Sequence, residues 1–76
     1  MYQELVEYIV KSLVEDPAAV DVSVSERGNH VDIEVHVAGD DMGRVIGKEG
    51  RVVNAIRDIV QVKATQDNKR VSLEIV

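Results

Sequence analysis

The hydrophobic residues of the first half of the chain follow two periods, one helical and one extended. Apolar side chains recur every three or four positions over residues 2–15, which predicts an amphipathic helix that ends before Pro17. Beyond the proline the period falls to two. Valine and isoleucine alternate with polar side chains over residues 20–26 and 31–37, on either side of an Arg-Gly-Asn turn at residues 27–29. These segments predict a hairpin with one buried face.

The second half of the chain returns to helical spacing and then to alternation. Residues 38–41 break the second strand and offer a helix N-cap, which predicts a short helix over about residues 41–46. Helical spacing resumes over residues 51–63, and alternation over residues 71–76 predicts a last strand. The order is helix, strand, strand, short helix, longer helix, strand. Three strands with one apolar face beneath three helices form a two-layer α+β sandwich.

Composition limits the kind of domain and site that we expect. The chain has 76 residues and no Cys, Phe or Trp. We therefore expect one domain with an aliphatic core, without disulfides or thiolate metal sites. No run of about 18 apolar residues occurs, and the first residues are acidic rather than basic. This pattern argues against a membrane span or a signal peptide and favours the cytoplasm.

The charge distribution matters more than the net charge. A net charge of −5 disfavours nucleic acid as a partner when it is taken alone. Residues 1–41 hold ten acidic and two basic side chains, whereas residues 44–57 hold four basic and one acidic. The positive segment surrounds the stretch VIGKEGR at residues 45–51. The outward face of the predicted sheet is acidic and has no aromatic side chain, so it is unsuited to stacking bases.

The glycine-containing stretch has the features of an anion-binding turn. Gly47 and Gly50 lack a Cβ, so the backbone between the two predicted helices can turn sharply and approach a ligand closely. The longer helix begins at this turn, and its first N–H groups and positive dipole end suit a phosphate. Lys48 at the tip, with Arg44 and Arg51 one turn away, adds attraction to a nucleic-acid backbone.

The run IGKEGRVVNAI at residues 46–56 resembles the I-G-x-x-G-x-x-I-x-x-I signature of KH domains, with Val53 where isoleucine is commoner. The additional N-terminal helix and strand resemble the type II arrangement. Over nearly its full length the chain resembles the KhpA family of small bacterial KH-domain RNA-binding proteins. The resemblance implies a single type II KH domain over residues 1–76 with the order α-β-β-α-α-β. Its three-stranded mixed sheet would be covered on one face by three helices, with the strands at 31–37 and 71–76 parallel and the strand at 20–26 antiparallel at one side.

The resemblance also implies a non-catalytic module that clamps about four unpaired nucleotides at the glycine loop, with their bases in an apolar groove. The residues that it assigns to RNA binding are Gly47, Lys48, Glu49, Gly50, Arg44, Arg51, Val45, Ile46, Val52 and Val53, the last four either in the groove or in the core beneath it. It assigns no cofactor, metal ligand or catalytic group. KhpA-like proteins are associated with RNA chaperone activity, with a KhpB-like or Jag-like KH partner, and with control of cell length and peptidoglycan synthesis.

Two features bear on how the chain would use such a fold. Glu49 places a negative charge where phosphates should pass, so we expect weak, sequence-tolerant RNA binding. The logarithm of the binding constant should fall with the logarithm of the salt concentration with a slope of about −2 to −3. The small size and aliphatic surface suit a second function, a protein-interaction module that forms a homodimer or docks a KH-containing partner. The glycine loop and the helix after it are candidates for the pairing face. An enzyme is a distant third, because no catalytic constellation is found.

Overall fold

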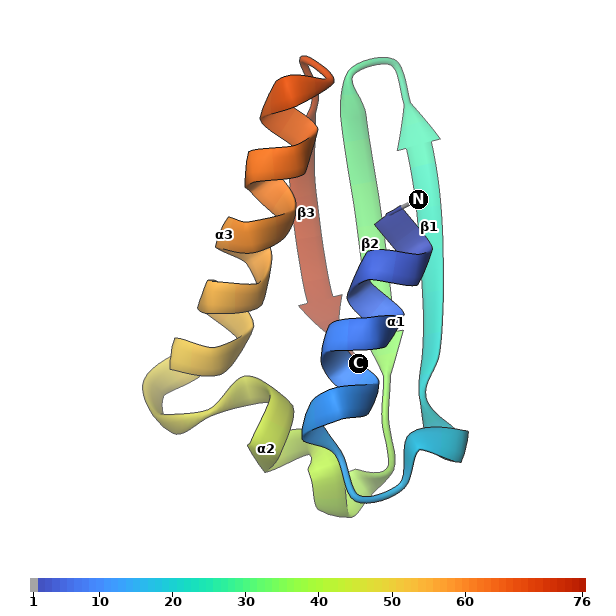
Figure 1. Cartoon of the computed structure of the whole chain (residues 1–76), viewed down its shortest axis with the longest axis vertical. Helices are drawn as coiled ribbons and strands as arrows, with labels where there is room; N and C mark the ends of the chain where they lie inside the picture. Colours follow the sequence, from blue (N-terminus) through green and yellow to red (C-terminus); the bar gives the residue numbers. More distant parts are fainter. Residues whose placement is uncertain (1) are drawn as a thin grey trace.

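The computed structural model describes residues 2–76, and its elements follow the predicted order (Figure 1). The helices are α1 (Tyr2–Leu13), α2 (Met42–Ile46) and α3 (Arg51–Gln66), and the strands are β1 (Asp21–Arg27), β2 (His30–His36) and β3 (Arg70–Ile75). Single turns of 3-10 helix occupy Pro17–Ala19, Gly39–Asp41 and Lys48–Gly50. The α+β class and the α-β-β-α-α-β order are therefore confirmed.

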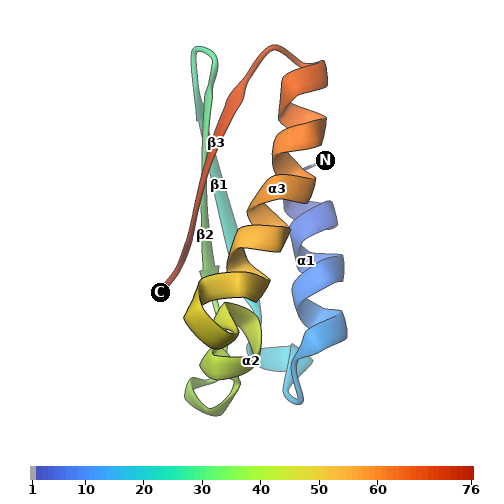
Figure 2. The same cartoon turned by 90° about the vertical axis from the view of Figure 1, so that its left-hand side faces the viewer.

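The three strands form one mixed sheet in the order β1-β2-β3. β1 pairs antiparallel with β2, and β2 pairs parallel with β3, as predicted. Parallel neighbours need a crossover connection, and α2 and α3 provide it between β2 and β3. Figure 2 shows the sheet in profile, with all three helices on one of its faces.

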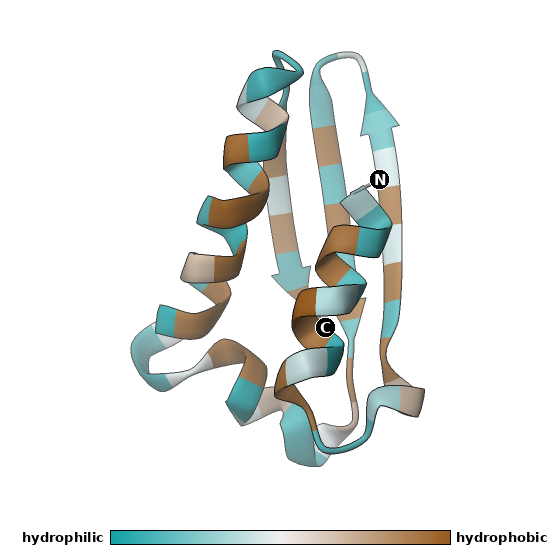
Figure 3. Cartoon of the chain, viewed as in Figure 1, coloured by the Kyte–Doolittle hydropathy of each residue, from teal (hydrophilic) through white to brown (hydrophobic). Residues whose placement is uncertain are grey.

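Aliphatic side chains from both layers form the core, and hydrophobic and hydrophilic positions alternate along the strands (Figure 3). The buried apolar residues are Tyr2, Val6, Val10, Val22, Val31, Ile33, Val35, Val45, Ile56, Val60, Ala64 and Leu73. The polar side chains predicted for the outer face of the sheet are exposed or half-buried, namely Asp21, Ser23, Ser25, Asp32, Glu34, His36, Ser72 and Glu74. Alternation therefore predicted correctly which strand residues face the helices.

Element boundaries differ from the predicted ones by one to three residues, each for a local reason. β1 and β2 extend toward each other because Arg27 pairs with His30 across the turn. β3 begins one residue early because the Arg70 N–H donates to the Asn29 carbonyl at 2.8 Å. α3 continues three residues beyond the predicted end because Ala64 is buried in the core.

Asp41 determines where α1 ends. The backbone N–H groups of Glu15 and Asp16 donate to the Asp41 carboxylate, at 3.0 Å to Oδ1 and 3.1 Å to Oδ2. These two N–H groups are thus unavailable to continue the helix, which stops at Leu13 rather than at residue 15. The prediction that residues 38–41 supply a side-chain N-cap for the short helix is wrong. Asp41 stands at the N-cap position, but the residue is only 3% exposed and its carboxylate binds the loop after α1 instead.

A tyrosine–carboxylate bond connects the first turn of α1 to the end of α3. Tyr2 Oη donates to Asp67 Oδ2 at 2.6 Å, and Lys63 Nζ lies 3.6 Å from the other carboxylate oxygen. This hydrogen bond, together with burial, raises the pKa of Tyr2 to about 12. The same bond is the main reason why the pKa of the Asp67 carboxyl lies below its usual value. Folding therefore favours the neutral phenol and the ionised carboxylate.

We expect Tyr2→Phe to lower the midpoint of thermal unfolding at pH 7 by about 5 °C, because one hydrogen bond to a charged acceptor is lost. Because the pKa of Tyr2 is raised on folding, Tyr2 contributes to the free energy of unfolding of the wild type. This contribution is complete below pH 10, the ordinary pKa of the phenol, and is lost as pH rises toward about 12. The contribution of Asp67 is present above its ordinary pKa of 3.8 and is lost as pH falls through its lower folded value.

Thermal unfolding followed by circular dichroism at pH 7 and pH 11 measures this effect. The deficit of Tyr2→Phe relative to wild type should shrink at pH 11, where the unfolded phenol of the wild type ionises. Tyr8→Phe is the matched control, because Tyr8 is 75% exposed and should change neither midpoint. An equal deficit of Tyr2→Phe at both pH values would contradict the assignment.

Candidate functional site

The predicted anion-binding stretch connects α2 to α3 in a single tight turn. Three of its residues have positive φ: Gly47 (φ 77°, ψ 173°), Glu49 (φ 58°, ψ 26°) and Gly50 (φ 77°, ψ 14°). Three backbone hydrogen bonds close the turn, one of them from the Arg51 N–H to the Lys48 carbonyl. The Gly47 N–H donates to the Gly43 carbonyl at 2.9 Å, and the Gly50 N–H donates to the Gly47 carbonyl at 3.2 Å.

The two glycines are required for different reasons. A Cβ on Gly47 would lie 2.8 Å from the backbone nitrogen of Val52 and 2.4 Å from one of its methyl groups. The loop backbone therefore packs directly against the first turn of α3, and no side chain fits. A Cβ on Gly50 would meet Asn54 Nδ2 at 3.7 Å, which is an ordinary contact. Gly50 is favoured by its left-handed conformation at the N-cap of α3 rather than by lack of space.

The two residues between the glycines project into solvent. Glu49 is a non-glycine residue in the left-handed region, which costs about 1 kcal/mol. Its carboxylate lies 3.7 Å from the Arg51 guanidinium, with the two side chains 72% and 78% exposed. Such a pair is weak and screened by salt. Among residues 2–76, Lys48 has no ion pair or hydrogen bond through its side chain, so its ammonium group is available to a ligand.

Arg44 is directed away from the turn. Its guanidinium pairs with Glu15, and its Nε lies 3.4 Å from Asp41 Oδ1. The positive segment predicted from the sequence is thus divided in the structure. Lys48 and Arg51 lie at the turn, whereas Arg44 contacts carboxylates of the loop after α1.

The apolar candidates separate by burial. Val45 is 0% exposed and belongs to the core, which settles for this residue the choice between groove and core. Ile46, Val52 and Val53 are half-buried and keep part of their surface in solvent. These three side chains offer apolar contact beside the turn.

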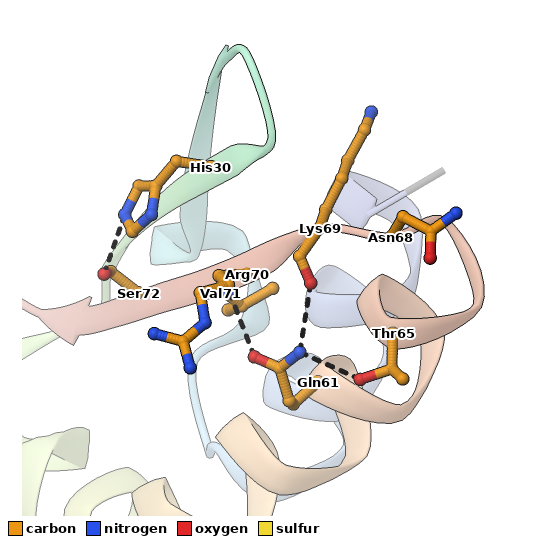
Figure 4. A pocket seen from close by; sticks show the side chains of 8 residues that line it. All are labelled: His30, Gln61, Thr65, Asn68, Lys69, Arg70, Val71 and Ser72. Carbon is orange, nitrogen blue, oxygen red and sulfur yellow. Dashed lines mark hydrogen bonds between the residues drawn. The ribbon is translucent and has the colours of Figure 1, made fainter.

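A polar hollow lies between the C-terminal half of α3 and the start of β3 (Figure 4). Gln61 forms its floor. Its Oε1 accepts the Val71 N–H at 3.1 Å, and its Nε2 donates to the Lys69 carbonyl at 3.2 Å and to Thr65 Oγ1 at 3.1 Å. The side-chain amide of Gln61 thereby connects α3 to the outer edge of β3. Sequence reasoning missed this residue, because periodicity marks it only as a polar position on the flank of a helix.

Histidine and carboxylate side chains form no metal-ligand cluster in the part of the chain that the structure describes. Residues 2–76 contain no group of three or more His, Cys, Asp or Glu side chains that could hold a metal ion. His30 lies 2.9 Å from Asp32 Oδ1 and 3.0 Å from Ser72 Oγ, so it takes part in a surface hydrogen-bond network. Within the same range no helix has the length and hydropathy needed to cross a membrane.

Known proteins resemble this chain over nearly all of its length. The family model described as KhpA/KhpB, KH domain, matches residues 3–75. The RNA-binding protein KhpA of Caldanaerobacter subterraneus subsp. tengcongensis is 47% identical over 73 residues, which cover 96% of this chain and 97% of that protein. The RNA-binding protein KhpA of Clostridium acetobutylicum is 45% identical over 74 residues, which cover 97% and 99%.

A solved structure shares the fold. It is the crystal structure of Era in complex with MgGDPNP and nucleotides 1506–1542 of 16S ribosomal RNA, with a TM-score of 0.70 and 23% identity. The match covers 97% of this chain but only 28% of the Era chain, so this protein spans less than a third of Era. The likeness shows that the α-β-β-α-α-β arrangement occurs as one part of a larger protein.

Proposed function

Because this chain belongs to the KhpA/KhpB KH-domain family, we propose that it binds single-stranded RNA at the Gly47–Gly50 turn. The observation that carries the proposal is the close packing at Gly47, where the loop backbone contacts the first turn of α3 without room for a side chain. This packing holds the turn against the N-terminus of α3, whose positive dipole end attracts a phosphate, while the N–H of the first helical residue, Arg51, already donates to the Lys48 carbonyl. Lys48 at the tip adds a full positive charge.

The surroundings of the turn suit an RNA strand on the helical side of the molecule. Ile46, Val52 and Val53 offer partly exposed apolar surface to bases. The outer face of the sheet is acidic and repels phosphates. The curated relatives carry the name RNA-binding protein, and the Era structure of similar fold contains a ribosomal RNA fragment. The apolar surface and the relatives support RNA rather than a small anion as the ligand, whereas the acidic sheet favours the helical side as the place of binding.

Binding should be weak and sensitive to salt. Among residues 2–76, only Lys48 and Arg51 offer cationic groups at the turn, since Arg44 pairs with Glu15. At roughly 0.7 per neutralised phosphate, two cations give a slope of about −1.4 for log affinity against log salt concentration. Release of Arg44 from its carboxylates would bring the slope to about −2, and a slope near −3 would need a fourth cation. We propose that Glu49 limits the affinity, because its charge is exposed beside the path of the phosphates.

Replacing Lys48 and Glu49 separately by glutamine should change RNA affinity in opposite directions. One unit charge about 7 Å from a phosphate in water is worth about 0.6 kcal/mol, or roughly threefold in affinity. We expect Lys48→Gln to weaken binding about threefold and to reduce the salt slope by about 0.7, and Glu49→Gln to strengthen it about threefold. Fluorescence anisotropy of a labelled single-stranded RNA, titrated at low and moderate salt, measures both effects.

Glu34→Gln serves as the control. It makes the same charge change as Glu49→Gln, but on the outer face of the sheet, and should leave the RNA affinity almost unchanged. Charge variants at the tip are cleaner than aspartate substitutions of both glycines, since a side chain at Gly47 disturbs the packing on Val52. RNA binding at this turn would be refuted if the folded Lys48→Gln, Glu49→Gln and wild-type proteins had the same affinity at low salt.

Protein interaction is a second candidate function, and the outward surface of α3 favours it. Ile59 is 52% exposed and Val62 is 63% exposed, although both are aliphatic. On this proposal the chain docks a second KH protein of the KhpB or Jag type. RNA chaperone activity and control of cell length and peptidoglycan synthesis are further proposals that follow from family membership. A wild-type protein that binds no RNA at low salt until such a partner is added would favour this second function.

A further inference from the structure

Arg44 lies close to the proposed RNA site but does not face it. It precedes Gly47 by three positions, and the hydrogen bond from the Gly47 N–H to the Gly43 carbonyl continues the helical spacing of α2 up to that glycine. One turn of helix, about 5 Å, therefore separates Arg44 from the glycine turn. The Arg44 side chain is 51% exposed, so solvent and ligands reach it. Its direction rather than its distance keeps the guanidinium from the turn.

Two carboxylates hold the guanidinium of Arg44, and they contact different nitrogen atoms. Asp41 Oδ1 lies 3.4 Å from Nε, whereas Glu15 Oε1 pairs with the terminal Nη2. Figure 1 shows α2 between the glycine turn and the loop after α1, so the pair with Glu15 directs the end of the side chain away from the turn. The terminal N–H groups of a guanidinium are among those that bind phosphate. Glu15 therefore occupies the part of Arg44 that a phosphate needs.

Glu15 is the weaker of the two partners. Asp41 is buried, and its carboxylate oxygens accept the backbone N–H groups of Glu15 and Asp16, so its position is fixed without Arg44. The Glu15 side chain is 75% exposed, and an ion pair between exposed side chains is weak. One substitution at Glu15 should therefore free the terminal nitrogens of Arg44 and leave the fold intact.

We propose that Glu15 restrains Arg44 and thereby limits the RNA affinity of the Gly47–Gly50 turn. In the wild type, the guanidinium would exchange two carboxylates for one phosphate, so it gains little by moving. Without Glu15, Nη2 turns to a phosphate of the bound strand while Nε stays within reach of Asp41. The proposal rests on RNA binding at this turn. It adds to the residues that determine affinity one that lies 29 positions before Arg44.

Removal of the Glu15 charge should strengthen RNA binding only when Arg44 is present. We expect Glu15→Gln to raise the affinity for a labelled single-stranded RNA about threefold, the effect of one unit charge near a phosphate in water. The slope of log affinity against log salt concentration should steepen by about 0.7, because a third phosphate is neutralised. Arg44→Gln alone should leave the affinity and the slope near their wild-type values, and in the double variant it should abolish the gain. Fluorescence anisotropy measures all three variants, after circular dichroism has shown that each is folded.

Asp16→Asn is the matched control for charge. It removes one negative charge from the residue next to Glu15, and the exposed side chain of Asp16 has no ion pair among residues 2–76. Its effect measures the general repulsion between this loop and RNA, which salt screens, and should be much smaller than that of Glu15→Gln.

Nuclear magnetic resonance of the Arg44 side chain gives a direct second measurement. On addition of the same RNA, the Nε–Hε signal of Arg44 should shift in the Glu15→Gln variant and stay in place in the wild type. This measurement needs no substitution at Arg44 itself.

The outcomes separate this inference from the RNA site on which it rests. The inference is overturned if Glu15→Gln and Asp16→Asn change the affinity equally, or if Glu15→Gln gives the same gain with and without Arg44. It is also overturned if Arg44→Gln weakens wild-type binding about threefold, since Arg44 would then already contact RNA. If Lys48→Gln weakens binding while Glu15→Gln has no effect, RNA binding at the turn stands and the restraint alone is refuted. No effect of either variant would refute both.

Discussion

Gly47→Ala should lower the free energy of unfolding by about 3 kcal/mol and the midpoint of thermal unfolding by about 15 °C. Two costs add at this position. The dihedral angles φ 77° and ψ 173° lie in a region that is almost exclusive to glycine. The new Cβ would also lie 2.8 Å from the Val52 backbone nitrogen, an atom that a rotamer change cannot move. Relief of this contact requires the turn and the first residues of α3 to separate.

Gly50→Ala is the matched control for Gly47→Ala. Its φ of 77° and ψ of 14° are left-handed helical, which alanine adopts at a cost of about 1 kcal/mol, and its Cβ would meet no atom closer than 3.7 Å. Urea denaturation at pH 7 should therefore show that Gly47→Ala lowers the free energy of unfolding two to three times as much as Gly50→Ala does, by the ratio of these estimates. Equal losses would show that the contact with Val52 does not restrict the turn.

RNA affinity should separate the two glycine variants in the same way. We expect Gly47→Ala to weaken RNA binding more than Lys48→Gln does, because the displaced backbone no longer faces the N-terminus of α3. Gly50→Ala should retain most of the affinity, since the space around it accommodates a methyl group. Titration at a temperature where each variant is folded measures the affinity apart from stability.

Asp41→Ala is the second substitution for which we expect a large loss, about 3 kcal/mol in the free energy of unfolding. The carboxylate accepts the N–H groups of Glu15 and Asp16 and lies beside the Arg44 guanidinium, while only 3% of the residue is exposed. Alanine leaves two backbone donors without their acceptor and removes a charge that balances Arg44. Asp41→Asn keeps one acceptor oxygen and should lower the free energy of unfolding about half as much as Asp41→Ala does.

The neighbouring residue supplies the control for Asp41. Asp40→Ala removes the same charge from an exposed side chain and should change the free energy of unfolding by less than about 0.5 kcal/mol. Urea denaturation of both variants, with the slope of each transition compared, measures the difference. If Asp40→Ala and Asp41→Ala had similar effects, the connection between the 3-10 turn and the end of α1 would contribute little to stability.

The sequence pattern predicted which residues face the core more reliably than how the elements are connected. Strict alternation in β1 and β2 identifies the buried valines, because the side chains of a strand alternate between two faces. Alternation does not say which strands are neighbours. The parallel pairing of β2 with β3 was expected from the KH resemblance, and the structure confirms it.

Contacts between residues far apart in the chain account for what the sequence did not predict. Residues 38–41 were expected to cap the helix that follows them, but the Asp41 carboxylate accepts hydrogen bonds from backbone that lies 25 and 26 positions earlier. Arg44 was expected at the turn, but it faces Glu15. The two glycines looked equivalent in the motif, and only the distance to Val52 separates their roles. In each case the deciding contact depends on tertiary structure.

The hydrogen bond between Tyr2 and Asp67 has a consequence for folding during biosynthesis. Tyr2 and Asp67 are 65 positions apart in the chain, so α1 leaves the ribosome long before Asp67 at the end of α3 has been made. The parallel neighbour of β2 is made later still, since β3 follows residue 67. The first helix therefore remains without its tyrosine bond until nearly all of the 76 residues have been synthesised. We expect the chain to complete its fold in one late, cooperative step rather than element by element during translation.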